Sequence, residues 1–151
     1  MAVFRIGRTT ELTAAECWRR VTDWPAHAAG VPLTSVSVTT PGPAGVGTVF
    51  VARTGAGGLG FDDPMEVVRW EPPAAGRPGV CRLEKRGRVV TGWAEIEVRP
   101  SAAGSVVLWV EDLRVRGLPR AADPLLASVG RVVFGAALDG LLSGRSGSRG
   151  R

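Results

Sequence analysis

One long helical segment near the C-terminus constrains the fold of this chain more than any other feature. Residues 121–144, AADPLLASVGRVVFGAALDGLLSG, show no strand period, and their apolar residues recur at helical spacing. We expect Asp123 to cap the helix, Pro124 to occupy its first position, and the face carrying Val129 and Val133 to turn toward the core. Gly130, Gly135 and Gly140 lower the helix propensity of this segment, but they could also leave room beneath the helix for a bulky group.

Most of the chain before this helix has the pattern of β-strands. Residues 2–8 indicate a first strand, and residues 33–115 contain about six more strand-like segments separated by turns rich in Gly and Pro. Residues 55–63, GAGGLGFDD, are expected to form a flexible loop. Because short turns join neighbouring strands, we expect one curved antiparallel sheet. One face of such a sheet needs cover, and only the C-terminal helix is long enough to provide it.

Two short helices are predicted between the first strand and the rest of the sheet. Thr13 and Glu16 have the spacing of a capping box at the start of a helix, and Pro25 ends that helix. The next residues add at most one further helical turn, which holds the only histidine, His27. We expect His27 to lie on the outer side of this turn and Trp24 to plug one end of the space between helix and sheet.

Length and charge limit the organisation and the partners of the protein. The 151 residues suit one domain, expected over residues 1–144, followed by a disordered basic tail, RSGSRGR, over residues 145–151. The net charge is +5, but the basic residues cluster only in this tail, so we expect no nucleic-acid binding. No apolar run approaches the ~20 residues of a bilayer span, and the N-terminus lacks a signal-peptide pattern, which predicts a cytoplasmic protein without stable membrane insertion.

The residues offer no motif for a metal or a cofactor, and we expect neither. One histidine and two distant cysteines, Cys17 and Cys81, cannot build a zinc site without several carboxylates. No nucleophile elbow is present. The stretch GAGGLG lacks the GK[ST] ending of a phosphate-binding loop and lies between strands rather than before a helix.

Strand alternation selects Glu111 as the main acidic candidate. Val107, Trp109, Glu111 and Leu113 share the more apolar face of their strand, so we predict that they face inward. A carboxyl among apolar neighbours has a raised pKa unless it is paired. Glu111 would then act as an acid or base or hold a ligand hydroxyl. The alternatives are an internal ion pair or a strand end that reaches solvent.

Arg53 and Lys85 are the basic candidates. Lys85, the only lysine, shares the apolar face of its strand with Leu83, but it lies near the strand end and could extend to water. Alternation does not decide which face of its strand Arg53 occupies. If Arg53 points inward, it would pair with Glu111 or with a ligand carbonyl or carboxylate. No catalytic residue is assigned beyond the candidates Arg53 and Glu111.

The predicted cavity lining combines these polar groups with large apolar side chains. Five tryptophans and no tyrosine supply large apolar area, and any tryptophan that lines a cavity would favour flat ligands by stacking. The predicted lining comprises Trp24, Arg53, Met65, Trp70, Leu83, Lys85, Trp109, Glu111, Leu113, Val129 and Val133.

In their order, several stretches resemble the START/SRPBCC superfamily, the helix-grip fold that includes the birch-pollen allergen and the bacterial polyketide cyclase/dehydrase group. They are TAAECWRRVTDWPAHAAGVP, GVGTVFVART, DDPMEVVRWEPP, GWAEIEVRP and the final helix after LP, and the likeness spans residues 2–143. The resemblance implies an α+β fold in which a curved antiparallel sheet of about six or seven strands wraps around the C-terminal helix, with two short helices after the first strand. It also implies a large, mostly apolar cavity between that helix and the sheet.

Three functions stay open at this point. The first is binding of a hydrophobic small molecule, such as a lipid, a polyketide or another aromatic metabolite, oriented by a few polar groups. The second is a polyketide cyclase, aromatase or dehydratase in which Arg53 or Glu111 polarises a carbonyl or shuttles a proton. The third is a structural or interaction module with its cavity collapsed around its own tryptophans. The fold does not decide between them, and the sequence names neither the ligand nor the oligomeric state, monomer or homodimer.

Overall fold

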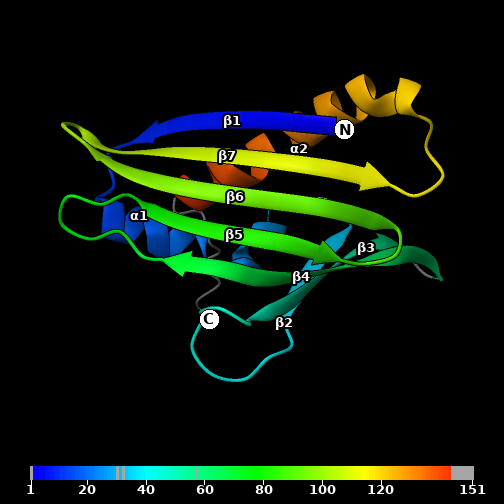
Figure 1. Cartoon of the computed structure of the whole chain (residues 1–151), viewed down its shortest axis with the longest axis horizontal. Coiled ribbons are helices and arrows are strands. Elements are labelled where there is room, and N and C mark those ends of the chain that lie inside the picture. The colour runs from blue at the N-terminus through cyan, green and yellow to red at the C-terminus, as the bar shows by residue number, and fades with distance from the viewer. Residues whose placement is uncertain (1, 30, 32, 57, 144–151) are drawn as a thin grey trace, which may run out of the picture.

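A computed structural model describes residues 2–29, 31, 33–56 and 58–143, and its centre is one seven-stranded antiparallel sheet (Figure 1). The strands are β1 (Ala2–Thr10), β2 (Thr34–Val38), β3 (Val49–Ala56), β4 (Leu59–Glu71), β5 (Gly79–Arg86), β6 (Val90–Ser101) and β7 (Gly104–Val115). Their order across the sheet is β1-β7-β6-β5-β4-β3-β2. The predicted basic tail, residues 145–151, lies outside the described residues.

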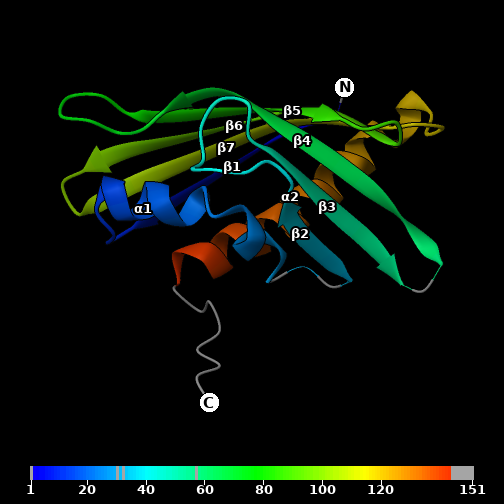
Figure 2. The same cartoon turned by 90° about the horizontal axis from the view of Figure 1, so that it is seen from below.

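Helices lie on one face of this curved sheet. The helices are α1 (Ala14–Val21), the 3-10 helices η1 (Trp24–Ala28) and η2 (Arg120–Ala122), and α2 (Asp123–Leu142). Seen from below, α2 passes beneath the sheet, and it packs against β1, η1 and α1 (Figure 2). The predicted α+β helix-grip architecture is therefore confirmed, including the two short helices after the first strand.

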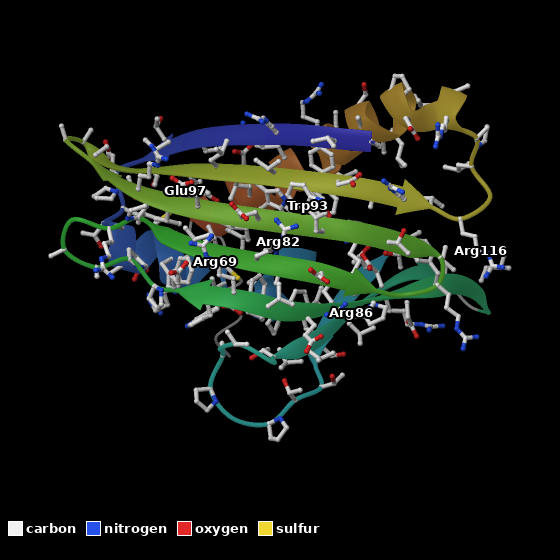
Figure 3. All side chains as sticks on the ribbon, in the orientation of Figure 1. Arg69, Arg82, Arg86, Trp93, Glu97 and Arg116 are labelled. Carbon is white, nitrogen blue, oxygen red and sulfur yellow. The ribbon has the colours of Figure 1, made fainter. Side chains whose placement is uncertain are left out.

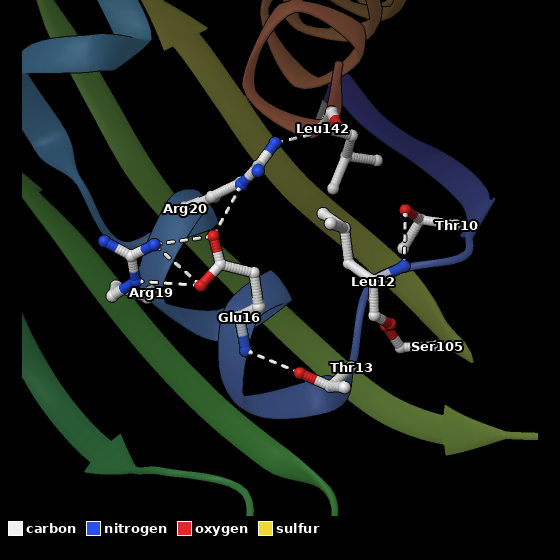
Figure 4. Close-up of polar contacts among 8 residues, drawn as sticks. All are labelled: Thr10, Leu12, Thr13, Glu16, Arg19, Arg20, Ser105 and Leu142. Atoms are coloured by element: carbon white, nitrogen blue, oxygen red, sulfur yellow. Dashed lines mark hydrogen bonds and ion pairs between the residues drawn. The ribbon is translucent and has the colours of Figure 1, made fainter. Parts of the chain in front are cut away.

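The N-terminus of α1 has the predicted cap. Thr13 Oγ1 accepts a hydrogen bond from the backbone N–H of Glu16 at 3.2 Å. The carboxylate of Glu16 accepts hydrogen bonds from Arg19 and Arg20 (Figure 4). Arg20 also donates to the carbonyl of Leu142 at 3.3 Å. This contact ties α1 to the last residue of α2.

Most of the expected flexible loop over residues 55–63 is instead paired strand, because Gly55 and Ala56 belong to β3 and residues 59–63 to β4, while Gly57 lies outside the described residues. β3 and β4 stay paired down to Ala56 and Leu59. Gly55 and Gly60 face each other across the pair, and a Cβ on Gly55, whose φ is +150°, would lie 2.2 Å from the carbonyl oxygen of Leu59. The glycines here permit close approach of two strands, which the composition alone does not distinguish from a flexible loop.

The start of α2 differs from the expectation by one residue. Asp123 is the first helical residue and Pro124 follows it, while Ala122 holds the N-cap position with nearly helical backbone angles (φ −84°, ψ −9°). The reason is that η2 leads directly into α2, so no extended residue separates the two helices.

We expected no apolar run long enough to span a bilayer, but the segment around α2 is one by length and composition. Arg120–Leu142 is long and apolar enough to cross a bilayer by length and composition, with a mean hydropathy of 1.7 over its best window. In this fold the segment is the core helix, because it packs on the sheet. A core helix and a membrane span share this composition, so the composition alone does not separate them.

Gly130 is the glycine that lets α2 approach the sheet. A Cβ at Gly130 would lie 2.6 Å from the ring of Phe4 on β1. That ring is buried and stacks on Phe134 with 5.6 Å between centroids. The bulky group for which this glycine leaves room is therefore an aromatic side chain of the protein itself.

Candidate functional site

A cavity of about 260 Å³ lies between α2, η1 and the concave face of the sheet. It is lined by residues of η1, of strands β2 to β7 and of α2. All but five of the lining residues are apolar. The polar five are His27, Thr34, Thr54, Asp63 and Glu111.

Aromatic rings form a continuous wall along this cavity. Trp24 stacks on Phe50 with 4.5 Å between centroids and 8° between planes. The ring of His27 lies 5.3 Å from Trp24 and 5.5 Å from Trp109, and Trp109 lies 5.6 Å from Phe134. Such a wall offers flat faces on which an aromatic ligand can stack.

A buried cluster of three charged side chains lies at the cavity, and we call Asp63, Lys85 and Glu111 the acid–lysine cluster. Lys85 Nζ donates to Asp63 Oδ2 at 2.7 Å and lies 3.2 Å from Glu111 Oε1. The Lys85 and Glu111 side chains are 1% exposed and that of Asp63 is 13% exposed. Trp109 Nε1 donates to the second oxygen of Glu111 at 3.2 Å. The cluster is thus an ion-paired unit that is nearly closed to solvent.

The sheet register explains how this cluster forms from three strands. Lys85 on β5 is paired with Met65 on β4, two residues beyond Asp63. Glu111 lies across β6 from β5, with Ala94 of β6 as its direct partner. Ala94 and the nearby Gly92 are small, so the long side chains of Lys85 and Glu111 can meet above β6.

Burial and mutual charge set the protonation of the cluster. Burial raises the pKa of Glu111, the Lys85 ammonium opposes that rise, and the nearby Asp63 carboxylate adds to it. Burial acts to lower the pKa of Lys85, but the attraction of the two carboxylates outweighs it, so the pKa of Lys85 is raised. Lys85 therefore stays charged at neutral pH, held between two acids.

Arg53 does not line the cavity. Its guanidinium pairs with Asp62 at 2.9 Å on the other face of the sheet, and its side chain is 57% exposed. Because Ala52 and Thr54 face the cavity, the residue between them must point outward. Lys85 takes the place beside Glu111 that the sequence assigned conditionally to Arg53, and the expectation that Lys85 could extend to water was wrong because the two carboxylates hold it inside.

His27 lines the cavity, so its expected position on the outer side of the turn was wrong. In a 3-10 helix residues three apart eclipse each other, so His27 follows Trp24 to the inner side. His27 Nε2 lies 2.7 Å from the carbonyl of Val21. Because a carbonyl only accepts, Nε2 carries the proton, and Nδ1 is an acceptor. Burial lowers the pKa of His27 to about 4, so the ring is neutral at pH 7.

Besides Arg53, three predicted lining residues lie outside the cavity lining: Trp70, Lys85 and Val129. Lys85 is buried against Asp63 and Glu111, and these two carboxyl groups rather than the ammonium line the cavity. The bulge between Val67 and Arg69 keeps Trp70 on the same face of the sheet as Val67, but Trp70 lies beside α1, where it packs edge-on against Trp18 at 5.1 Å. Val129 is 51% exposed and points away from the sheet, because the inner face of α2 is centred on neighbouring positions. The other apolar residues of the predicted lining do line the cavity: Trp24, Met65, Leu83, Trp109, Leu113 and Val133.

The two cysteines are buried free thiols. Burial raises the pKa of Cys81 to about 12 and also raises that of Cys17. Neither thiol is therefore a nucleophile at neutral pH. Within the part of the chain that the structure describes, no group of three or more His, Cys, Asp or Glu side chains could hold a metal ion.

Asp63 and His27 are titratable side chains that line the cavity, and the sequence analysis did not place either of them there. Asp63 fell in the segment interpreted as a loop, although extending the alternation backward from Met65 would have placed it on the inward face. His27 had a weaker signal, namely its spacing of three from Trp24 in a short turn. Both omissions concern segments whose secondary structure was misjudged or left open.

Comparison with known proteins identifies structural neighbours only. No protein-family model matches the chain, and no curated protein sequence matches it. Among solved structures, Ara h 8.0201 is similar at 14% identity with a TM-score of 0.62, covering 93% of this chain and 97% of that one. The Zhui aromatase/cyclase from Streptomyces sp. R1128 is similar at 17% identity with a TM-score of 0.67, covering 93% and 91%.

A further neighbour is a point mutant of norcoclaurine synthase from Thalictrum flavum, in complex with a transition-state analogue. It is similar at 14% identity with a TM-score of 0.65, covering 93% of this chain and 91% of that one. At such low identities the likeness shows the shared fold alone.

Proposed function

Because this chain has the helix-grip fold of the START/SRPBCC superfamily, we propose that it binds a small, mostly apolar molecule in the cavity between α2 and the sheet. Burial of apolar surface supplies the affinity, and the aromatic wall favours a flat ligand. The acid–lysine cluster orients the polar end of that ligand.

The observation that carries this proposal is an apolar cavity with a charged cluster on its wall. Its volume of about 260 Å³ exceeds that of a cavity which holds benzene, about 150 Å³. The space thus suits a compact molecule of a few rings better than a long acyl chain. The collapsed-cavity alternative is disfavoured because the tryptophans line this space without filling it.

An uncharged dye tests the proposal directly. We expect the fluorescence of phenylnaphthylamine to rise on binding to the purified protein, and native mass spectrometry to detect apolar molecules that copurify. Ala52→Phe fills the cavity from β3 and should abolish dye binding. Ala56→Phe is the matched control, since Ala56 lies on the same strand but outside the cavity lining. Equal dye binding by both variants would contradict the proposal.

A second candidate function is catalysis of the cyclase or aromatase type. Glu111 favours it, because a buried carboxyl with a raised pKa at a cavity wall is suited to proton transfer. The similarity to the aromatase/cyclase supports only the fold that this activity would need. A cavity of this size would accept a short ketide better than a long one.

Turnover separates the two candidates. Under the enzyme hypothesis, a short poly-β-ketone is cyclised by the wild-type protein, and Glu111→Gln removes turnover while leaving dye binding intact. Under the binding hypothesis, both proteins bind the dye and neither changes the ketone faster than buffer does.

A further inference from the structure

The geometry of the acid–lysine cluster points to a charge preference: we propose that the cavity takes a small aromatic molecule with a protonated amine at one end, held by Asp63, and that it discriminates against the matching carboxylate. This inference rests on the proposed binding function and adds the chemical class of the ligand.

One carboxylate oxygen of the cluster has no protein partner. Asp63 Oδ2 accepts from Lys85, but the buried Oδ1 has no hydrogen-bond partner. Asp63 as a residue is 9% exposed and belongs to the cavity lining. A buried acceptor without a donor is costly, and a donor supplied by a ligand would remove that cost.

The charged donor at this wall is already fully used. An ammonium group has three N–H bonds. Those of Lys85 are directed at Asp63 Oδ2, at Glu111 Oε1 and at the sulfur of Met65, 3.6 Å away. A ligand carboxylate at this wall would therefore compete with Asp63 and Glu111 for the same cation.

The other polar groups of the lining do not supply a second cation. No Arg or Lys occurs among the described lining residues, and His27 is neutral with its proton directed at Val21. Trp24 Nε1 is a buried donor without a partner, and it is uncharged. It could serve a carbonyl at the other end of the ligand, and it gives a carboxylate no full charge to pair with.

The charges of the cluster favour a cation over a neutral donor. Two carboxyl groups, those of Asp63 and Glu111, face the single ammonium of Lys85, so a ligand ammonium beside Asp63 completes a set of two acids and two cations. An alcohol could donate to Asp63 Oδ1 but would leave this imbalance. The nearby aromatic wall also attracts cations through its ring faces.

Three matched probes test the preference by isothermal titration calorimetry at neutral pH. They are naphthylethylamine, naphthylethanol and naphthylacetate, which share one ring system and differ in the charge of the polar end. We expect the amine to bind the wild-type protein at least about tenfold more tightly than the alcohol, in the range of a hydrogen bond to a charged group. Naphthylacetate should bind most weakly.

Two neighbouring variants locate the preference at the cluster. Asp63→Asn removes the excess negative charge and should bring the amine affinity down to that of the alcohol. Asp62→Asn changes the net charge by the same amount on the exposed face and should keep the wild-type ranking. Far-ultraviolet circular dichroism verifies that each variant is folded. If Asp63→Asn does not fold, the order of the three probe affinities for the wild-type protein still tests the charge preference.

Each contrary result identifies which proposal fails. The charge preference would be overturned if naphthylethanol or naphthylacetate bound the wild-type protein as tightly as naphthylethylamine or more tightly. Binding of phenylnaphthylamine would still support the cavity function in that case. A preference for the amine that survives in Asp63→Asn would overturn the role of Asp63. If neither the three probes nor the dye binds, the charge preference and the binding function both fail.

Discussion

Asp62 and Asp63 are consecutive residues of β4 whose carboxylates form ion pairs on opposite faces of the sheet. Asp62 pairs with Arg53 at 2.9 Å, and Asp63 pairs with Lys85 at 2.7 Å. The first pair is more than half exposed, whereas the Lys85 side chain is 1% exposed. The two pairs have similar geometry but opposite surroundings, so solvent rather than distance decides what each contributes.

The convex face extends the exposed side of this comparison. Figure 3 shows that face, with Arg69, Arg82, Arg86, Trp93 and Glu97 projecting from it. The guanidinium of Arg82 lies 4.4 Å from the ring centroid of Trp93, and Arg86 pairs with Glu66 at 3.0 Å. Such pairs keep the outer face soluble and contribute little stability each. The acid–lysine cluster on the concave face has only three charged side chains, and Lys85 contacts both of the others.

The largest expected effect comes from breaking the buried side. Lys85→Met leaves two buried carboxylates without their cation, which should lower the free energy of unfolding by about 3–5 kcal/mol. Urea denaturation at neutral pH measures this loss. A urea midpoint of Lys85→Met within error of the wild-type midpoint would contradict this, because it would show that water solvates the two carboxyl groups or that they are protonated.

The pH dependence of stability sharpens the same contrast at His27. Its pKa is about 4 in the folded protein against an ordinary value of 6.5, so the native state binds fewer protons than the unfolded state between these values. Stability should therefore fall as the pH drops from 6.5 to 4, by up to about 3 kcal/mol. Denaturation of wild-type and His27→Gln proteins across this range should show a shallower slope for the variant.

The pH dependence of the wild-type protein alone does not isolate His27, because the titration of Glu111 changes the free energy of unfolding with pH in the opposite direction. The pKa of Glu111 is raised in the fold, so its contribution to stability decreases as the pH rises above its ordinary value of 4.5. The difference between wild type and His27→Gln isolates the histidine. Parallel curves for the two proteins would mean that His27 titrates normally.

Two glycines of α2 offer a smaller test. Gly130→Ala places a Cβ against the buried Phe4 ring and should cost about 1–3 kcal/mol by overpacking. A Cβ at Gly140 would meet no atom within 4 Å, so Gly140→Ala should gain up to about 1 kcal/mol from helix propensity. Thermal denaturation compares the two variants with the wild type, and a Gly130→Ala protein at least as stable as the wild type would contradict the packing described for Phe4.

The smallest effect is expected on the exposed pair. Arg53→Met should change the free energy of unfolding by less than about 1 kcal/mol, because water solvates Asp62 when its partner is removed. The change should shrink further at high salt. A loss comparable to that of Lys85→Met would remove the distinction between the two faces.

Much of the fold could be predicted from local patterns. The alternation in β7 placed Glu111 and Trp109 inward, and the Thr13 cap marked the start of the first helix. Pro25 does not end that helix as expected: α1 already ends at Val21, and Pro25 lies in the first turn of η1. The prediction failed where one pattern has two structural meanings. Glycine-rich residues 55–63 suggested a loop and therefore concealed Asp63, because close strand approach and flexibility have the same composition.

The sequence by itself determined the order of the elements, the helix that covers the sheet and the inward direction of Glu111, because each follows from periodicity within one segment. Only the tertiary structure decided that Lys85 rather than Arg53 meets Glu111, and that Asp63 joins them. The reason is that the cluster depends on the register of four neighbouring strands and on the small residues of β6 between β5 and β7. No single segment contains that information.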